Sequence, residues 1–334
     1  MNPNPNPFQL VLDALLNEKK EFSPKFLHHF SDMGALELKT LGDIWSRVSV
    51  KRKLNVLEQL EALAEENTLV SFDDFAKSIL NDEDASVRGR ALRLLRESDD
   101  TRLIPQYIDL LKSDADAQTR AEAAANLGMF VALGELEEIP PAIKQQVEDE
   151  LLSAANGNDD GRVRRRALEA LGFSSRPEVM ALIESSFKRE DPAWQTSALF
   201  AMGRSADNRW NEDVIASLAN VNRNVRESAV EAAGQLGIKE TLPILLKLVE
   251  EEEDDDVTGA IIWSLSQIGG EDARAFIENL LDQTDDENED QIEFLEEALE
   301  NLAFTDELDK FDLFNIEPDL VEFDGEEEDE EEDS

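Results

Sequence analysis

The stretch DGRVRRRALEALG, from Asp160 to Gly172, holds four arginines within five positions of a chain whose formal net charge is −45. An aspartate followed by apolar residues at helical spacing, and then by a glycine, is typical of a short helix with a capped start and a glycine at its end. The stretch therefore predicts a helix. It also raises the question of whether its arginines form a binding site or hold the fold together.

This pattern recurs along the chain. Related stretches begin at Asp84, Asp116, Asp191, Asn222 and Asp254, and a weaker copy begins at Asn288. Neighbouring copies are 31 to 34 residues apart, except for a spacing of 44 residues between Asp116 and Asp160. There GELEEIPPAIKQQ, residues 134–146, is expected to enlarge a connection. A fixed period of this size is typical of stacked supersecondary units.

Each period reads as two helices. Apolar residues at helical spacing, as in LIPQYIDLL (residues 103–111), predict a first helix, and the stretch after the Asp or Asn turn predicts a second. Neither helix buries its apolar stripe alone, so stacking on neighbours is required. The sequence predicts an all-α fold, an α-solenoid of stacked antiparallel helix pairs. The absence of cysteine excludes disulfides and thiolate metal sites.

A helical wheel separates the four arginines. With Val163 at 0°, Arg164 falls at about 100°, inside the apolar arc, whereas the other three fall on the open side. Equivalent buried positions are occupied by Arg88, Arg120 and Arg226. Because an unpaired buried charge costs several kcal/mol, these arginines should pair with carboxylates. The expected partners are the turn aspartates Asp84, Asp116 and Asp160 of the same or the adjoining repeat. We call this expected series of Asp–Arg pairs between repeats the ladder. It should be interrupted where Gln195 and Thr258 replace arginine.

The pattern D-x-x-V-R-x-x-A-x-x-x-L-G resembles the HEAT-like repeat of phycobilisome lyases, the E-Z type, over about residues 74–303. The resemblance implies a bacterial HEAT-repeat protein in which the second helix of each pair lines a concave side. Families with such repeats include scaffolds, chaperone-like factors, transport receptors and a few enzymes. The resemblance supplies no catalytic residue.

The expected organisation has four parts. Residues 1–7 form a disordered polar tether, residues 8–80 a helical cap or degenerate repeats, and residues 81–303 the repeat array. Residues 304–334 form an acidic tail that is mostly disordered, because from Asp282 onward there are 26 acidic residues and one basic residue. The tail could dock in a cationic groove. SRVSVKRK, residues 46–53, is a basic patch for an acidic partner or for the tail.

Open-side positions on the concave face are the candidate binding residues. They are Arg90, Arg93, Arg165, Arg166, Phe200 and Trp263. Arginine and aromatic residues carry much of the affinity in protein interfaces, so this face is expected to bind a protein segment. The alternative is that Phe200 and Trp263 tuck between helices.

Two other stretches have competing interpretations. The loop with Arg204, Asp207, Arg209 and Trp210 is either a recognition loop or an Arg–Asp clamp over a stacked tryptophan. The run of carboxylates at residues 250–256 is either a weak calcium site or a solvated surface, and it lacks the ligand spacing of a calcium loop.

Enzyme signatures are missing from the sequence. His28 and His29, the two histidines, are adjacent and cannot form an i,i+4 metal pair, and HEAT-repeat di-iron hydroxylases need several His-Glu pairs. The acidity argues against a nucleic-acid groove. No leader or membrane span is recognised. We expect a cytoplasmic, monomeric, non-catalytic scaffold or assembly factor without cofactor, metal, nucleic-acid or membrane binding.

Its partner is a protein, and a basic one is an option because the chain is acidic. The acidity alternatively reflects solubility or a salty cytoplasm. The second functional interpretation is a lyase-like or enzyme-accessory protein that acts on a chromophore-bearing partner.

Overall fold

The computed structural model describes residues 7–285 and 287–311, which form helices and contain no strand. The all-α prediction is confirmed. The α-helices are α1 (Pro7–Leu16), α2 (Ala35–Trp45), α3 (Val50–Glu66), α4 (Asp73–Ile79), α5 (Ala85–Leu94), α6 (Ile104–Ser113), α7 (Ala117–Glu135), α8 (Pro141–Asn156), α9 (Gly161–Ala170), α10 (Pro177–Phe187), α11 (Pro192–Arg204), α12 (Asn211–Ser217), α13 (Arg223–Gln235), α14 (Leu242–Glu251), α15 (Asp255–Ile268), α16 (Glu271–Gln283) and α17 (Glu289–Phe311). The 3-10 helices are η1 (Pro24–Phe30), η2 (Thr101–Leu103), η3 (Leu171–Phe173), η4 (Asn208–Trp210) and η5 (Lys239–Thr241).

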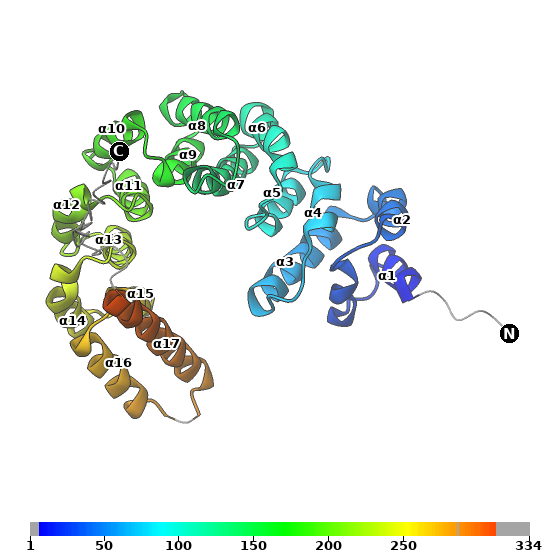
Figure 1. Cartoon of the computed structure of the whole chain (residues 1–334). Coiled ribbons are helices and arrows are strands. Elements are labelled where there is room, and N and C mark those ends of the chain that lie inside the picture. Colours follow the sequence, from blue (N-terminus) through cyan, green and yellow to red (C-terminus); the bar gives the residue numbers. More distant parts are fainter. Residues whose placement is uncertain (1–6, 286, 312–334) are drawn as a thin grey trace, which may run out of the picture. The chain divides into compact units, whose positions relative to one another are not determined.

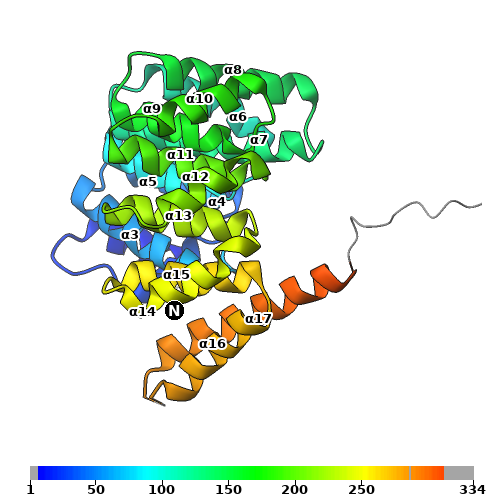
Figure 2. The same cartoon turned by 90° about the vertical axis from the view of Figure 1, so that its left-hand side faces the viewer.

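The chain divides into two compact units, with the boundary between Ala232 and Ala233 inside α13. In unit 1, the first helices α6, α8 and α10 lie on one side and the second helices α5, α7, α9 and α11 on the other (Figure 1). Figure 2 shows the helices from α8 to α12 as successive rungs. We call the surface formed by α5, α7, α9 and α11 the second-helix face. In unit 2, α15 and α16 both pack on α17.

Polar caps start the second helices, as the repeat pattern predicts. A side-chain oxygen of each cap accepts a hydrogen bond from a backbone amide in the first turn. For example, Asp84 accepts from the Ser86 amide at 2.9 Å and Asp116 from the Thr119 amide at 2.8 Å. The same bond is made by Asp160, Asp191, Asn222 and Asp254. The helix starts predicted from the repeat are therefore confirmed at these six residues.

The arginine ladder pairs with different carboxylates from those expected. Arg88 binds Asp114 through two bonds, Nε–Oδ2 at 2.7 Å and Nη2–Oδ1 at 2.8 Å. Arg120 binds Asp159 in the same way, at 2.9 and 2.6 Å. The predicted partners Asp84, Asp116 and Asp160 were wrong because these residues cap their helices. The carboxylate one or two positions before the cap of the next repeat takes the arginine.

The ladder changes chemistry at Arg164. The turn of the next repeat carries Arg189 at the position of Asp114, and Glu190, at the position of Asp159, forms no ion pair with Arg164 in the described part of the chain. Arg164 lies over the ring of Trp194 at 5.2 Å and donates to the carbonyl oxygen of Ala155 at 3.1 Å. The expected carboxylate partner is therefore replaced by an aromatic ring and a carbonyl. Arg226 donates to the carbonyl oxygen of Asn220 at 3.1 Å.

The ladder also begins earlier in the chain than Arg88, on α3. Lys53 of α3 stands four residues after the cap Ser49, and its Nζ lies 2.6 Å from Oδ2 of Asp82. Trp45 Nε1 donates to the same oxygen at 2.7 Å. Burial alone would raise the pKa of Asp82, but the bonds from Lys53, the Asp84 amide and Trp45 together hold it below its usual value. The contact of the ladder thus also joins α3 to the turn before α5.

Two expected boundaries need correction. The long spacing before Asp160 does not enlarge a loop: α7 and α8 are themselves long, and residues 136–140 connect them. Helix α17 continues to Phe311, beyond the expected end of the array at residue 303. The expected disorder of residues 1–6 and 312–334 falls outside the described residues.

Candidate functional site

Two of the candidate residues, Arg90 and Arg93 on α5, are engaged by carboxylates. Arg90 Nη1 lies 2.7 Å from Glu61 of α3, and Arg93 Nε lies 3.3 Å from the same carboxylate. Arg93 also reaches Glu122 of α7 at 3.4 Å. Glu122 is buried and also accepts from Arg96 and from Gln118. At this end of the second-helix face the predicted cationic patch is therefore partly neutralised.

The other two candidate arginines lie on α9 and differ from one another. Arg166 pairs with Glu169 at 2.6 Å, and Glu169 also accepts a hydrogen bond from Ser197 Oγ at 2.6 Å. Arg165 is half-buried and forms no ion pair with any residue in the described ranges. A ligand that binds this guanidinium therefore has no protein carboxylate to displace.

A pocket of about 590 Å³ opens on the second-helix face around these arginines. Its lining includes Arg162, Arg165 and Arg166 of α9, together with Thr196 of α11 and Asn224 of α13. The lining carboxylates are already bonded, Glu169 to Arg166 and Ser197, and Asp191 to the Ala193 amide. The buried hydroxyl of Thr196 has no partner among the described residues. The pocket offers more free donors than acceptors.

Phe200 is covered by a residue that the sequence analysis assigned to a loop. The guanidinium of Arg204 lies between two rings, 4.2 Å from the Phe200 centroid and 4.9 Å from that of Phe173. Burial lowers the pKa of Arg204, nearby Arg96 and Arg166 lower it further, and Glu169 opposes this shift. No sequence pattern indicates this cluster, because its members belong to two repeats.

Trp263 does not belong to the same described surface. It lies on α15 in unit 2, its side chain is 37% exposed, and it stacks on Phe294 of α17 at 6.5 Å. The remaining candidates Arg90, Arg93, Arg165, Arg166 and Phe200 all lie in unit 1. Trp263 is therefore no part of the second-helix face of unit 1.

The loop after α11 forms the clamp rather than an open recognition loop. Asp207 and Arg209 pair at 2.6 Å, and the guanidinium of Arg209 lies 5.9 Å from the centroid of Trp210. Trp210 is buried, with 4% of its surface exposed. Arg204 takes no part in the clamp, because it turns back toward Phe173.

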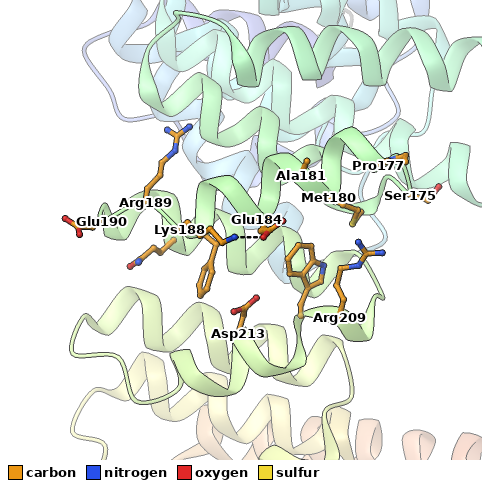
Figure 3. Close-up of a pocket in the computed structure, with 13 residues that line it drawn as sticks. Ser175, Pro177, Met180, Ala181, Glu184, Lys188, Arg189, Glu190, Arg209 and Asp213 are labelled. Carbon is orange, nitrogen blue, oxygen red and sulfur yellow. Dashed lines mark hydrogen bonds and ion pairs between the residues drawn. The ribbon is translucent and has the colours of Figure 1, made fainter.

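A second pocket, of about 830 Å³, lies on the other side of unit 1 between α10 and α12. Figure 3 shows Met180, Ala181 and Glu184 of α10 along it, with Asp213 and Arg209 on the opposite wall. Its three basic side chains, Lys188, Arg189 and Arg209, are matched by Glu184, Glu190 and Asp213. This first-helix pocket has no net charge and carries no signal for one class of ligand.

The basic patch at residues 46–53 is mostly structural. Arg52 is buried and donates to the carbonyl oxygens of Asn17 and Lys20, and Lys53 is buried against Asp82. Of the three adjacent cations Lys51, Arg52 and Lys53, Lys51 alone is exposed. The expectation of a dense basic surface is corrected, because two of its three adjacent cations point into the fold.

Neither a metal centre nor a membrane span emerges from residues 7–285 and 287–311. No group of three His, Asp or Glu side chains is arranged to hold a metal ion there, and no helix combines the length and apolar character needed to cross a bilayer. Asp254, in the acidic run at residues 250–256, caps α15.

Comparison with known proteins gives the following. Residues 211–296 match a family model described as HEAT repeats. No curated protein sequence matches the chain. Similar solved structures include the Escherichia coli protein YibA, with TM-score 0.43, 14% identity and coverage of 86% of this chain and 99% of that one. Importin beta has a TM-score of 0.42 and 13% identity, and the match covers 90% of this chain and 47% of that one. This chain therefore spans less than half the length of importin beta. Human deoxyhypusine hydroxylase in complex with glycerol has a TM-score of 0.34 and 14% identity, and the match covers 78% of this chain and 95% of that one.

All three scores lie below the level at which a likeness supports a functional argument. The helix pairs and the family match make the chain an all-α solenoid that carries HEAT repeats over residues 211–296.

Proposed function

We propose that the chain is a non-catalytic scaffold or assembly factor, and that the second-helix face of unit 1 binds a segment of a partner protein. The observation that carries this proposal is the pocket of about 590 Å³ around Arg165, whose guanidinium has no ion-pair partner in the described part of the chain. The volume is in the usual range for binding pockets, about 300–1,000 Å³.

The chemistry of the face suits recognition better than catalysis. Its carboxylates Glu122 and Glu169 are already bonded to arginines, so neither stands ready to move a proton. Its other groups are arginines, hydroxyls and an amide, which bind and orient a partner. Arginine and aromatic anchors of this kind dominate the affinity of protein interfaces.

Site-specific photocrosslinking tests the proposal. A benzophenone side chain is placed at Ala193, which is exposed and lines the second-helix pocket. The matched control site is Ala181, an exposed alanine in the first-helix pocket. After irradiation in lysate of the native cell, we expect a protein adduct at position 193 and none at 181. The change Arg165→Ala should reduce the yield at position 193 at least about fivefold, because a desolvated charge-assisted bond contributes about 1.5–3 kcal/mol.

Two results would contradict the proposal. An adduct that forms at position 181 alone moves the site to the first-helix pocket. An adduct at position 193 whose yield is the same with and without Arg165→Ala means that the pocket is merely near a partner and does not recognise it.

A further inference from the structure

The guanidinium groups of Arg96, Arg166 and Arg204 lie near two carboxylates, those of Glu122 and Glu169. Arg93 also reaches Glu122, but it has Glu61 as a second partner. Arg96 is paired with Glu122 at 2.5 Å and Arg166 with Glu169 at 2.6 Å. Arg204 lies within electrostatic reach of both these arginines and of Glu169, yet it has no ion pair with any described residue. One positive charge in this half-buried cluster is therefore uncompensated, although the chain as a whole is strongly acidic. An unmatched charge in such surroundings favours an anionic ligand.

The surroundings of Arg204 fix its orientation and leave most of its N–H donors without an acceptor among the described residues. The rings of Phe173 and Phe200 lie 4.9 and 4.2 Å from the guanidinium carbon. Its one hydrogen bond within the described residues is from Nη1 to the carbonyl oxygen of Glu169, at 3.5 Å. Five N–H donors lie at the edge of a guanidinium plane. Rings that hold the group in place therefore prepare that edge for an acceptor at little cost in conformational entropy.

We propose that Arg204, held between Phe173 and Phe200, binds the carboxylate of an aspartate or glutamate in the partner segment, and that Arg165 is a second anchor for the same acidic segment. This inference rests on the proposed function and gives the chemistry of the partner. Arg165 lies on α9 and Arg204 ends α11, so the segment crosses two neighbouring second helices. A carboxylate is planar and accepts two parallel N–H bonds from the guanidinium fork, which fixes its position as well as its charge.

The charge of the chain favours a short acidic segment over a nucleic acid. Duplex DNA carries about one charge per 1.7 Å, and most of that charge would lie outside the cluster, facing a molecule of net charge −45. The carboxylates of a short acidic segment would contact the arginines directly. Their repulsion by remote carboxylates of the chain is screened beyond about 8 Å at physiological salt. The cluster thus selects a local acidic motif.

The experiment measures binding of a fluorescein-labelled peptide of alternating glutamate and alanine to the full chain at physiological salt, by fluorescence polarisation. A glutamine–alanine peptide is the matched probe. We expect the glutamate peptide to bind at least about tenfold more tightly than the glutamine peptide, because charge-assisted hydrogen bonds are about twice as strong as neutral ones. The change Arg204→Lys, which keeps the charge and removes the fork, should weaken binding about tenfold. Arg209→Ala loses one charge within the Asp207 clamp and should change binding less than about twofold.

The Nε–Hε resonance of Arg204 in the wild-type chain gives a readout that needs no variant. It should shift and saturate as the glutamate peptide is added. Absence of glutamate-peptide binding, an unshifted resonance, or equal affinity of the Arg204→Lys chain each overturns the inference. An equal shift with inorganic phosphate at the same concentration overturns the choice of carboxylate. If the photocrosslinked adduct at position 193 persists unchanged in the Arg204→Lys chain, this inference fails while the proposed function stands. If no adduct forms at position 193 in the otherwise wild-type chain, both the inference and the proposed function fail.

Discussion

At the scale of single residues, one charged contact holds the turn before each of α5, α7 and α9 to the preceding second helix. A basic residue four positions after a helix cap meets a carboxylate just before the next cap, as in Lys53 with Asp82 and Arg88 with Asp114. The side chains of Lys53 and Asp82 are 8% and 3% exposed. Water therefore screens this pair little, and removing one partner leaves a charge that the fold has no means to solvate.

The change Asp82→Ala should lower the free energy of unfolding by about 3–5 kcal/mol, because it leaves Lys53 buried without a counterion. The control Asp84→Ala, two residues away, removes a helix cap and should cost about 1 kcal/mol. Urea denaturation measures both. Equal losses would show that the buried pair has no special role. If Asp82→Ala does not fold, the double change Lys53→Met with Asp82→Leu should restore folding, because an apolar pair replaces a buried ion pair without leaving a charge.

The bonds on Asp82 also predict how this contact depends on pH. The pKa of Asp82 is held below its ordinary value of 3.8, so the folded chain binds the proton less tightly than the unfolded chain does. Its contribution to stability is complete above about pH 4 and is lost as the pH falls through the folded pKa. Asp114 behaves in the same way.

Glu231 predicts the opposite dependence. Burial, with a smaller effect from Glu227, raises its pKa above the ordinary 4.5, and it has no hydrogen bond or ion pair with any residue that the structure describes. The folded chain therefore holds this proton more tightly, and stability falls as the pH rises through the ordinary pKa toward the folded one. The change Glu231→Gln should raise the unfolding midpoint at pH 7 by a few degrees and have little effect at pH 4. Glu212→Gln, on the exposed surface of α12, should have little effect at either pH.

At the scale of helices, the distance between neighbouring second helices is set partly by glycine. A Cβ at Gly172 would lie 2.9 Å from Ala201 Cα and 3.0 Å from the Ala201 carbonyl oxygen. These are backbone atoms of α11, so they cannot move aside independently of the helix. Gly89 of α5 differs, because a Cβ there meets nothing within 4 Å.

The two glycines therefore predict opposite effects of alanine. Gly172→Ala should cost about 1–3 kcal/mol, because overpacking pushes α11 away from η3. Gly89→Ala should add about 1 kcal/mol, because alanine is the better helix former and has room. Thermal unfolding of both variants measures the difference. Stabilisation of both would mean that the close approach at Gly172 relaxes without strain.

Helices and their starts were predictable from the sequence, whereas their partners were not. Asp84 and Asp116 mark the beginning of a second helix through a local bond, which sequence spacing reveals. The wheel also shows that Arg88 faces the neighbouring repeat. It cannot choose between Asp114 and Asp116, because both are within reach until the backbone turn is known. The spacing from Ser49 to Lys53 was an available signal for the contact between Lys53 and Asp82.

The candidate site was predictable to a similar depth. The open-side position of Arg165 follows from helical geometry, and the structure places it in a pocket. The cluster of Arg204 was not predictable, because Phe173 ends one repeat and Phe200 lies in the next. Their meeting depends on packing between repeats, and no period in the sequence records it.

At the scale of the whole molecule, charge is distributed unevenly between the units. Residues 233–334 carry 37 of the 77 acidic residues but only 4 of the 32 basic ones. Such a surplus destabilises the compact state by self-repulsion. It also gives this part of the chain a field that suits basic proteins, so the expectation of a basic partner is a prediction for unit 2, separate from the acidic segment proposed for unit 1.

Salt should therefore stabilise unit 2 more than unit 1. Between low salt and about 1 M NaCl the screening length falls to about 3 Å, which removes most repulsion between exposed carboxylates. Amide hydrogen exchange in α14 to α17 should slow about fivefold, equivalent to about 1 kcal/mol, and helices α5 to α11 are the internal reference. Equal slowing in both units would mean that the surplus of carboxylates does not strain unit 2.

The pairing of Lys53 and Arg88 with the turn that follows each has a consequence for how such a gene can change. Asp82 and Asp114 stand 32 positions apart, as do the caps Asp84 and Asp116. Excising residues 82–113 in frame would put Asp114 opposite Lys53 and Asp116 at the head of the next helix. A duplication of the same length would likewise leave every counterion matched. Whole repeats can therefore be gained or lost here by recombination. The number of repeats can change during evolution without leaving a buried charge unpaired.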